Sequence, residues 1–225
     1  MSITENFRKL RQEIPEHVTI VLAAKTRTPE EVEEAIAAGA TDIGENYVQE
    51  AEAMFQALGE KAKQVKWHMI GTLQKNKINK ALPMFDIFQT VDSLDKAVAL
   101  NKRAARLNKE LPVYIEVNIG GEASKSGMPP EYASIEQLVR DMAELEYIRV
   151  EGLMTMGPMS PDPEESRPYY RDTKKIFDKL TELHIPNISM NTLSMGMSGS
   201  YKVAVEEGST MVRLGTIVFG SRQYT

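Results

Sequence analysis

Hydrophobic residues along the chain follow two patterns that alternate from beginning to end. Short apolar runs rich in β-branched residues predict buried parallel strands, and a repeat of about 3.6 residues predicts amphipathic helices. The strand candidates are residues 19–27, 42–46, 66–72, 86–91, 112–120, 149–157, 191–198 and 210–220. A helical pattern lies between each consecutive pair of these runs. The chain is therefore predicted to be a series of βα units.

The clearest unit follows the first run, because its helix has sequence signals at both ends. Thr28, Pro29 and Glu31 give an N-cap, a proline in the first turn and a capping-box acid. Gly39 is placed to end the same helix. Residues 3–12, ahead of the first strand, also predict a helix, since apolar residues lie along one side of it.

Eight strand candidates separated by seven helices predict an α/β protein with a closed (β/α)8 TIM-type barrel, formed by residues 1–225 as one domain. No helical pattern follows the eighth run, so we expect the helix at 3–12 to complete the outer ring. A doubly wound open sheet is the alternative fold. The absence of a G-x-G-x-x-G motif after an early strand disfavours it.

Composition narrows the classes of partner. The 225 residues carry a net charge of -5, which disfavours nonspecific binding to nucleic acid or to an anionic membrane. No stretch approaches the roughly 20 apolar residues that a membrane span needs. Without cysteine the chain has no disulfide, thiolate metal site or cysteine nucleophile. We expect a cytoplasmic protein with no metal site, no nucleic acid and no membrane partner.

Chemistry in a parallel barrel gathers where the strands end. Lys25 ends the first strand candidate, and a desolvated lysine there is a candidate Schiff-base amine. The segments SMGMSGS and RLGT follow the seventh and eighth strands, where barrels commonly hold a phosphate on backbone amides. Together these groups predict a phosphorylated aldehyde, of which pyridoxal 5'-phosphate is the obvious one. The simpler interpretation is a lysine that meets solvent and two glycine-rich turns.

Other residues near the strand ends admit two interpretations each. Arg213 can face a pyridine nitrogen, which would then stay unprotonated because a guanidinium only donates, or it can bind the phosphate. His68 can act as an acid or base, or pack in the core. Met195 can border the ring, or it can pack in the core as most of the thirteen methionines are expected to do. Lys125, in the loop GGEASKSG, is a candidate second amine for cofactor transfer.

Six segments resemble the pyridoxal phosphate homeostasis protein family, whose members are similar to the barrel domain of alanine racemase. They are residues 25–51, 67–77, 118–128, 151–157, 193–198 and 208–222, with the motifs GENYVQE, W-H-x-I-G, S-x-G-M-S and M-V-R-x-G-T. The resemblance implies a fold-type III barrel that holds pyridoxal 5'-phosphate as an imine on Lys25. The residues that the family pattern further implies around the cofactor are Ser198, Gly215 and Thr216 on the phosphate, Arg213 at the ring nitrogen, and Asn46 and His68 nearby. Ala24 precedes the lysine where the family usually has a serine, which removes any tuning by that hydroxyl.

The resemblance also bears on catalysis. Racemisation needs proton donors on both faces of the planar carbanion. Racemases of this fold type bring the opposing tyrosine from an added β-domain and a partner subunit, and no such segment follows the barrel pattern here. We therefore expect a non-catalytic, monomeric protein that holds the cofactor and delivers it to recipient enzymes that depend on it.

Two enzymatic alternatives remain open. The first is a small racemase or lyase that uses Lys25 with His68 or a tyrosine as the opposing base. The second is a Schiff-base aldolase acting on sugar phosphates. Aldolase lysines commonly lie on a later strand, so the position of Lys25 on the first strand disfavours the second alternative.

Overall fold

Eight parallel strands close into a barrel in chain order in a computed structural model that describes residues 2–122, 126–158 and 160–221. The strands are β1 Thr19–Ala23, β2 Asp42–Glu45, β3 Lys66–Met69, β4 Ile87–Val91, β5 Leu111–Val117, β6 Ile148–Thr155, β7 Ile188–Ser194 and β8 Met211–Leu214. Val21 of β1 is paired with Asp42 of β2 on one side and with Arg213 of β8 on the other, which closes the barrel. The predicted (β/α)8 barrel is confirmed.

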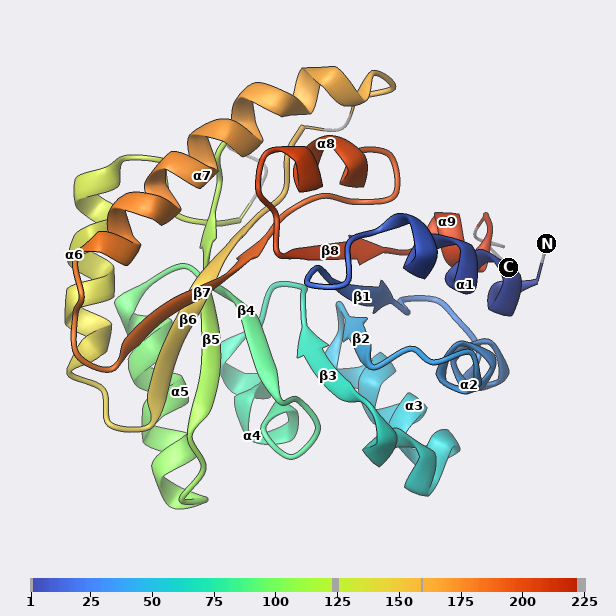
Figure 1. Cartoon of the computed structure of the whole chain (residues 1–225). Coiled ribbons are helices and arrows are strands. Elements are labelled where there is room, and N and C mark those ends of the chain that lie inside the picture. The colour runs from blue at the N-terminus through green and yellow to red at the C-terminus, as the bar shows by residue number, and fades with distance from the viewer. Residues whose placement is uncertain (1, 123–125, 159, 222–225) are drawn as a thin grey trace.

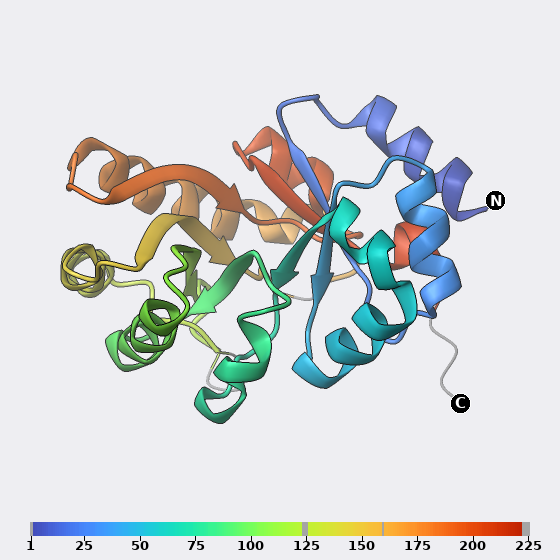
Figure 2. The same ribbon diagram turned by 90° about the horizontal axis from the view of Figure 1, so that it is seen from below.

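Helices cover the outside of the barrel, as Figures 1 and 2 show from two directions. The helices are α1 Ile3–Glu13, α2 Pro29–Ala37, α3 Val48–Leu58, α4 Ile78–Ala81, α5 Leu94–Arg106, α6 Tyr132–Ala143, α7 Arg167–Glu182, α8 Tyr201–Glu206 and α9 Thr216–Phe219, with short 3-10 helices η1 Gly59–Gln64, η2 Lys75–Lys77 and η3 Pro163–Ser166. The capping box predicted for α2 is present, because the Thr28 side chain accepts from the Glu31 N–H and the Glu31 side chain accepts from the Thr28 N–H.

The end of the barrel differs from the sequence prediction. The run 210–220 was expected to be one strand with no helix after it, but the strand ends at Leu214 and α9 begins at Thr216. A short apolar run such as TIVF fits a buried helix as well as a strand, so periodicity alone does not separate them. Helix α1 packs against α2 and α9, and Asn6 Nδ2 donates to the Val218 carbonyl at 2.9 Å. The predicted place of α1 in the outer ring is confirmed, although it shares that place with α9.

The barrel interior holds both apolar and polar side chains. A small apolar cluster of Val21, Ile87, Tyr114, Met154 and Met211 is separate from the large core between the strands and the helices. Buried polar groups share the interior with it, among them the side chains that form the hydrogen-bond chain described below. The inside of the barrel is therefore able to fix polar side chains in place.

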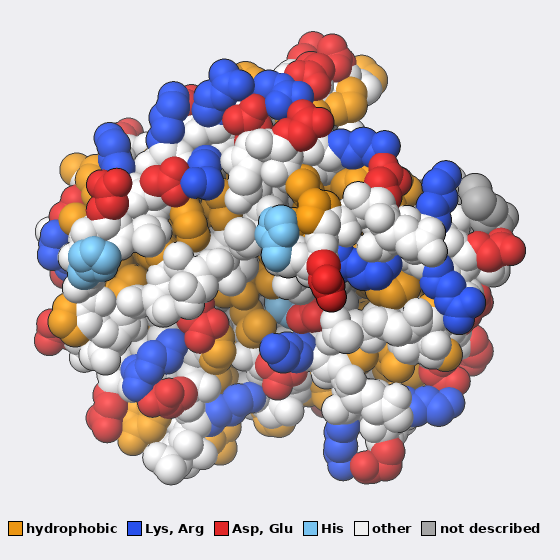
Figure 3. Space-filling view, viewed as in Figure 1, with side chains coloured by type: hydrophobic (Ala, Val, Ile, Leu, Met, Phe, Trp, Pro, Cys, Tyr) orange, Lys and Arg blue, Asp and Glu red, His pale blue; other side chains and the backbone are white. Residues whose placement is uncertain are grey.

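The outer surface carries charges of both signs. On the face shown in Figure 3, lysine and arginine side chains are interspersed with aspartate and glutamate side chains. Within the described ranges, no helix combines the length and the apolar character needed to span a bilayer.

Candidate functional site

A cavity of about 590 Å³ opens where the loops after β1, β2, β7 and β8 meet. We call it the mouth pocket, and its polar lining includes Lys25, Asn46, Ser198, Arg213, Gly215 and Thr216. No acidic side chain of the described residues lines it, whereas two cationic ones do. The pocket is therefore electrostatically suited to an anion, although the whole protein is acidic.

Lys25 reaches the pocket because the backbone turns sharply after β1. Thr26 has a φ of 64°, a left-handed conformation that is rare for a β-branched residue. The Thr26 N–H donates to Glu50 Oε2 at 3.3 Å. The strand thus stops at Ala23, and Lys25 lines the mouth pocket.

Two loops meet at Ser198 on the other side of the pocket. Ser198 Oγ accepts hydrogen bonds from the Gly215 N–H at 3.1 Å and from the Ile217 N–H at 3.4 Å. Because that oxygen accepts twice, its own proton is free to be donated into the pocket. Thr216 opens α9, so its N–H belongs to the first turn, where helical amides have no intrahelical acceptor. Hydroxyl and amide donors of this kind suit a phosphate group.

Arg213 lies at the base of the pocket and is 5% exposed. Its Nη1 donates to Ser194 Oγ at 2.7 Å and its Nη2 donates to the Thr155 carbonyl at 2.8 Å. Burial lowers the pKa of Arg213 to about 10, so the guanidinium is still charged near pH 7. These two hydrogen bonds fix its orientation and leave other N–H groups to face a ligand.

A chain of hydrogen bonds continues from Arg213 across the barrel interior. Ser194 Oγ is 2.7 Å from Gln89 Oε1, Gln89 Nε2 is 2.9 Å from His68 Nδ1, and His68 Nε2 is 2.8 Å from Asp42 Oδ1. A guanidinium only donates, so Ser194 must accept from Arg213 and give its own proton to Gln89. The Gln89 amide then donates to His68, which donates to Asp42. Every donor therefore points away from the mouth pocket.

Asp42 ends this chain at the start of β2. Burial alone would raise the pKa of its carboxyl, but hydrogen bonds from His68 and Thr41 outweigh burial and hold the pKa below its ordinary value. Asp42 is therefore a carboxylate near neutral pH and accepts from His68.

The structure brings six of the eight predicted site residues into the lining of one pocket, and the other two, His68 and Met195, lie outside that lining. His68 is fully buried in the hydrogen-bond chain and does not line the mouth pocket. Met195 is also fully buried, while Met156 and Met197 line the pocket. Lys125 lies outside the described residues.

Sequence reasoning did not assign Gln89 to the site, and it included Ser194 only as the first residue of the SMGMSGS segment. Both side chains are fully buried, in strands that carry other polar residues as well. Such residues in a buried strand need partners, and this was the signal in the sequence.

Asn46 is held in the pocket wall by a close approach of two backbones. A Cβ atom on Gly71 would lie 2.2 Å from the Asn46 carbonyl oxygen and 2.7 Å from the Asn46 Cα atom. Real Cβ atoms do not come this close to backbone atoms, so only glycine fits at position 71 without a shift of Asn46.

A Gly71→Ala variant is accordingly expected to displace Asn46 and to lower the free energy of unfolding by about 2 kcal/mol, the usual cost of overpacking. Urea denaturation of the variant and the unsubstituted protein measures this difference. Gly199→Ala is the matched control, because nothing lies within 4 Å of the added carbon at that position. Equal denaturation midpoints for Gly71→Ala and the control would contradict the proposed packing.

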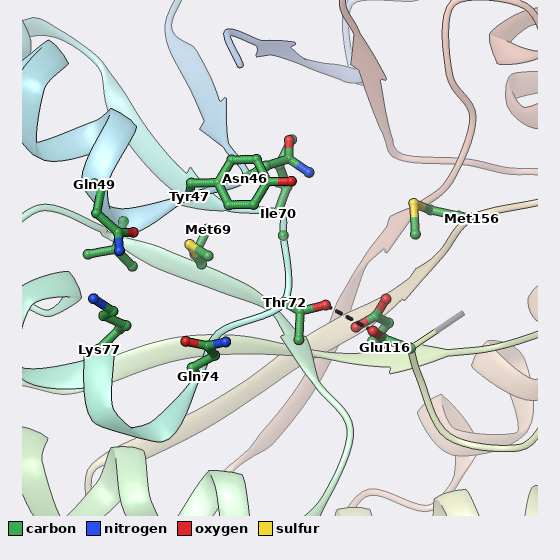
Figure 4. Close-up of a pocket in the computed structure, with 13 residues that line it drawn as sticks. Asn46, Tyr47, Gln49, Met69, Ile70, Thr72, Gln74, Lys77, Glu116 and Met156 are labelled. Carbon is green, nitrogen blue, oxygen red and sulfur yellow. Dashed lines mark hydrogen bonds between the residues drawn. The ribbon is translucent and has the colours of Figure 1, made fainter. Parts of the chain in front are cut away.

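A second cavity of about 450 Å³ adjoins the mouth pocket, and we call it the side cavity. The two share Asn46, Ile70 and Met156 in their walls. Figure 4 shows the side cavity, with Glu116 and Met156 on one side and Lys77 and Gln49 on the other. The dashed line marks the hydrogen bond of 2.9 Å between the hydroxyls of Thr72 and Ser126.

Comparison with known proteins gives a consistent set of similarities. The family model described as alanine racemase, N-terminal domain, matches residues 1–223. The pyridoxal phosphate homeostasis protein of Aquifex aeolicus is 40% identical over 202 residues, which cover 90% of this chain and 86% of that protein. The protein of the same name from Escherichia coli K12 is 38% identical, over 94% of this chain and 88% of that protein.

Solved structures show the same relationship. PipY of Synechococcus elongatus, solved with pyridoxal phosphate bound, has a TM-score of 0.89 and 30% identity, covering 97% of this chain and 100% of that chain. Alanine racemase of Clostridium difficile has a TM-score of 0.83 at 19% identity, covering 99% of this chain and 57% of that chain. At that identity the racemase likeness concerns the fold alone.

Proposed function

The chain belongs to the alanine racemase N-terminal domain family and, within it, to the pyridoxal phosphate homeostasis proteins, and on this premise we propose that it binds pyridoxal 5'-phosphate through the amine of Lys25. In this role it takes part in cofactor homeostasis. The observation that carries the proposal is the mouth pocket, which joins a lysine on one side to a set of anion donors on the other.

The residues present fit this cofactor. Its phosphate requires hydroxyl and amide donors, and Ser198, Gly215 and Thr216 lie together in the pocket wall. Its aldehyde requires an amine, and Lys25 lines the same pocket. The bound cofactor supplies an electrophilic carbonyl carbon, with which a lysine amine condenses with loss of water. A pocket without acidic lining, in the part of the chain described, does not repel the phosphate.

Each remaining residue of the site has a proposed part. Arg213, held in place by Ser194 and the Thr155 carbonyl, would face the ring nitrogen and donate to it. Asn46 forms the wall at the other side of the ring. His68 supports the pocket from within the barrel, and Met195 packs in the core between the strands and the helices, since neither lines the pocket.

We further propose that the protein holds and hands on the cofactor in the cytoplasm, as a monomer and without turnover of its own. The support is that the curated relatives named above are homeostasis proteins by name rather than enzymes. The recipients would be enzymes that depend on pyridoxal 5'-phosphate. Sustained interconversion of D- and L-amino acids by the purified, loaded protein would contradict this part of the proposal.

Borohydride reduction of the purified protein with pyridoxal 5'-phosphate, followed by peptide mass mapping, tests the attachment. We expect visible absorption that borohydride removes, and a reduced adduct on the peptide that contains Lys25. The same adduct on a different lysine, or no adduct, would overturn the proposal.

A further inference from the structure

Glu116 is a buried carboxyl group with an unsatisfied oxygen. It lies on β5, its residue is 3% exposed, and its Oε2 has no hydrogen-bond partner among the described residues. Buried carboxyl oxygens are normally paired, because leaving one unpaired costs the desolvation of that group. The Glu116 carboxyl group therefore keeps a capacity to accept a hydrogen bond that no described residue fills.

The side cavity is the space that this carboxyl group lines. Its wall is continuous with that of the mouth pocket through Asn46, Ile70 and Met156. Glu116 and Met156 lie on the same side of the cavity in Figure 4, with Lys77 and Gln49 opposite. A ligand donor that meets Glu116 would thus be held close to the wall that the two cavities share.

The neighbouring charges leave the carboxyl group free for such a donor. Burial raises the pKa of Glu116 to about 7, with a contribution from Asp92, while Lys96 and Arg213 act in the opposite direction. Lys96 Nζ is bound to Asp92 Oδ1 at 2.8 Å and to the Thr90 carbonyl at 3.1 Å.

Arg213, the other nearby cation, is equally committed elsewhere, to Ser194 and to the Thr155 carbonyl. Neither cation makes a hydrogen bond to Glu116 Oε2, which has no partner. The Glu116 carboxyl group therefore titrates near neutral pH and forms no ion pair within the described part of the chain.

We propose that Glu116, as the carboxylate, binds the ammonium group of a primary amine in the side cavity, beside the mouth pocket. This rests on the proposed function, because an amine is the class of molecule that can compete with Lys25 for an aldehyde.

The chemistry of the cavity supports an amine over other ligands. A carboxylate attracts an ammonium group, and Lys77, the one cationic side chain of the described lining, lies on the opposite side of the cavity from Glu116. Glu116 is the only acidic side chain among the described residues that line the cavity, so there is no set of oxygens for a divalent cation. Hydroxyl and amide groups of Thr72, Gln49 and Gln74 complete a polar lining that tolerates a small hydrated ligand.

Binding of propylamine to the protein without cofactor tests the proposal directly. We would follow it by saturation-transfer NMR at about pH 8.5, where Glu116 is ionised and the amine is still largely protonated. Propanol and propionate serve as neutral and anionic ligands of similar size. We expect propylamine to bind to the unsubstituted protein, and its affinity to fall at least about tenfold in Glu116→Gln, which is about 1.4 kcal/mol.

Glu45→Gln is the matched control. Glu45 is 1% exposed and also has an unpaired Oε2, but it lines a different cavity. Its replacement should leave propylamine binding unchanged. Equal affinity in Glu116→Gln and the unsubstituted protein, or an equal loss in both variants, would overturn the proposal. Glu116→Met gives the same comparison if the amide variant does not fold.

A parallel borohydride experiment separates this proposal from the proposed function. An adduct on Lys25 in Glu116→Gln, combined with lost propylamine binding, supports the amine site. Absence of the adduct from the unsubstituted protein would overturn the proposed attachment of the cofactor to Lys25. It would also overturn the amine site, because that proposal requires an amine to compete with Lys25 for the cofactor's aldehyde. Propylamine bound without dependence on Glu116 would overturn the amine site alone.

Discussion

A Lys25→Ala variant is expected to lose covalent attachment of pyridoxal 5'-phosphate completely. The mouth pocket would keep its phosphate donors, because Ser198 and Gly215 are held by each other and not by the lysine. Cofactor would then bind only without a covalent bond, and we expect affinity to fall at least about 100-fold, or about 2.7 kcal/mol. Absorption spectroscopy with borohydride trapping measures the attachment, and equilibrium dialysis measures the affinity.

Lys80→Ala is the control for this experiment, because Lys80 is exposed on α4 and is paired with Glu52 at 3.3 Å. In the Lys80→Ala variant, the reduced adduct on Lys25 should form as it does in the unsubstituted protein. A Lys25→Ala protein that still accumulates a full equivalent of reduced adduct on another lysine would show that the amine of residue 25 is dispensable.

Replacement of Glu45 by glutamine is expected to produce the largest change in stability. Burial and, to a smaller extent, the charge of Glu50 raise the pKa of Glu45 to about 8, although a hydrogen bond from the Asn46 backbone acts in the opposite direction. Below the ordinary pKa of 4.5 both folded and unfolded chains hold the proton, so no stability is lost there.

As pH rises from there towards about 8, the unfolded chain releases the proton while the folded one keeps it, and stability falls. Each unit of pKa difference is worth about 1.4 kcal/mol, so the loss from this one group is on the order of 4 kcal/mol. The Glu45→Gln variant has no ionisable group at this position, so this loss of stability is removed.

Urea denaturation at a series of pH values checks this prediction. The difference in free energy of unfolding between Glu45→Gln and the unsubstituted protein should grow in favour of the variant from about pH 4.5 to about pH 8. Glu60→Gln, at a side chain that is 86% exposed, should follow the unsubstituted protein at every pH. Parallel curves for Glu45→Gln and the unsubstituted protein would mean that Glu45 ionises normally in the folded state.

The architecture could be predicted from the sequence because each βα unit carries its own local signals. Thr28 and Glu31 specify a helix start by hydrogen bonds within four residues, and the structure contains both. The site followed from topology, since strand ends converge in any parallel barrel, and Lys25 and Arg213 each lie at or just beyond a strand end. Such inferences need no knowledge of side-chain contacts.

The depth of a side chain within the barrel could not be predicted in the same way. His68 lies one residue from the end of β3, but whether it reaches the pocket depends on the tilt and stagger of the strands. Its link to the site runs through Gln89 and Ser194, which are 105 positions apart in sequence and meet only because the barrel closes. Likewise, α9 begins at Thr216, just after Gly215, in a run whose apolar residues on both sides of the glycine fit a strand as well as a helix.

The hydrogen-bond chain from Arg213 to Asp42 has a consequence for how protons reach the cofactor site. To carry a proton from one rim of the barrel to the other, Ser194, the Gln89 amide and His68 would each have to reverse their roles, and the amide would have to rotate inside a packed interior. The interior therefore insulates one rim from the other. Protons gained or lost during cofactor loading are therefore not expected to travel along this chain.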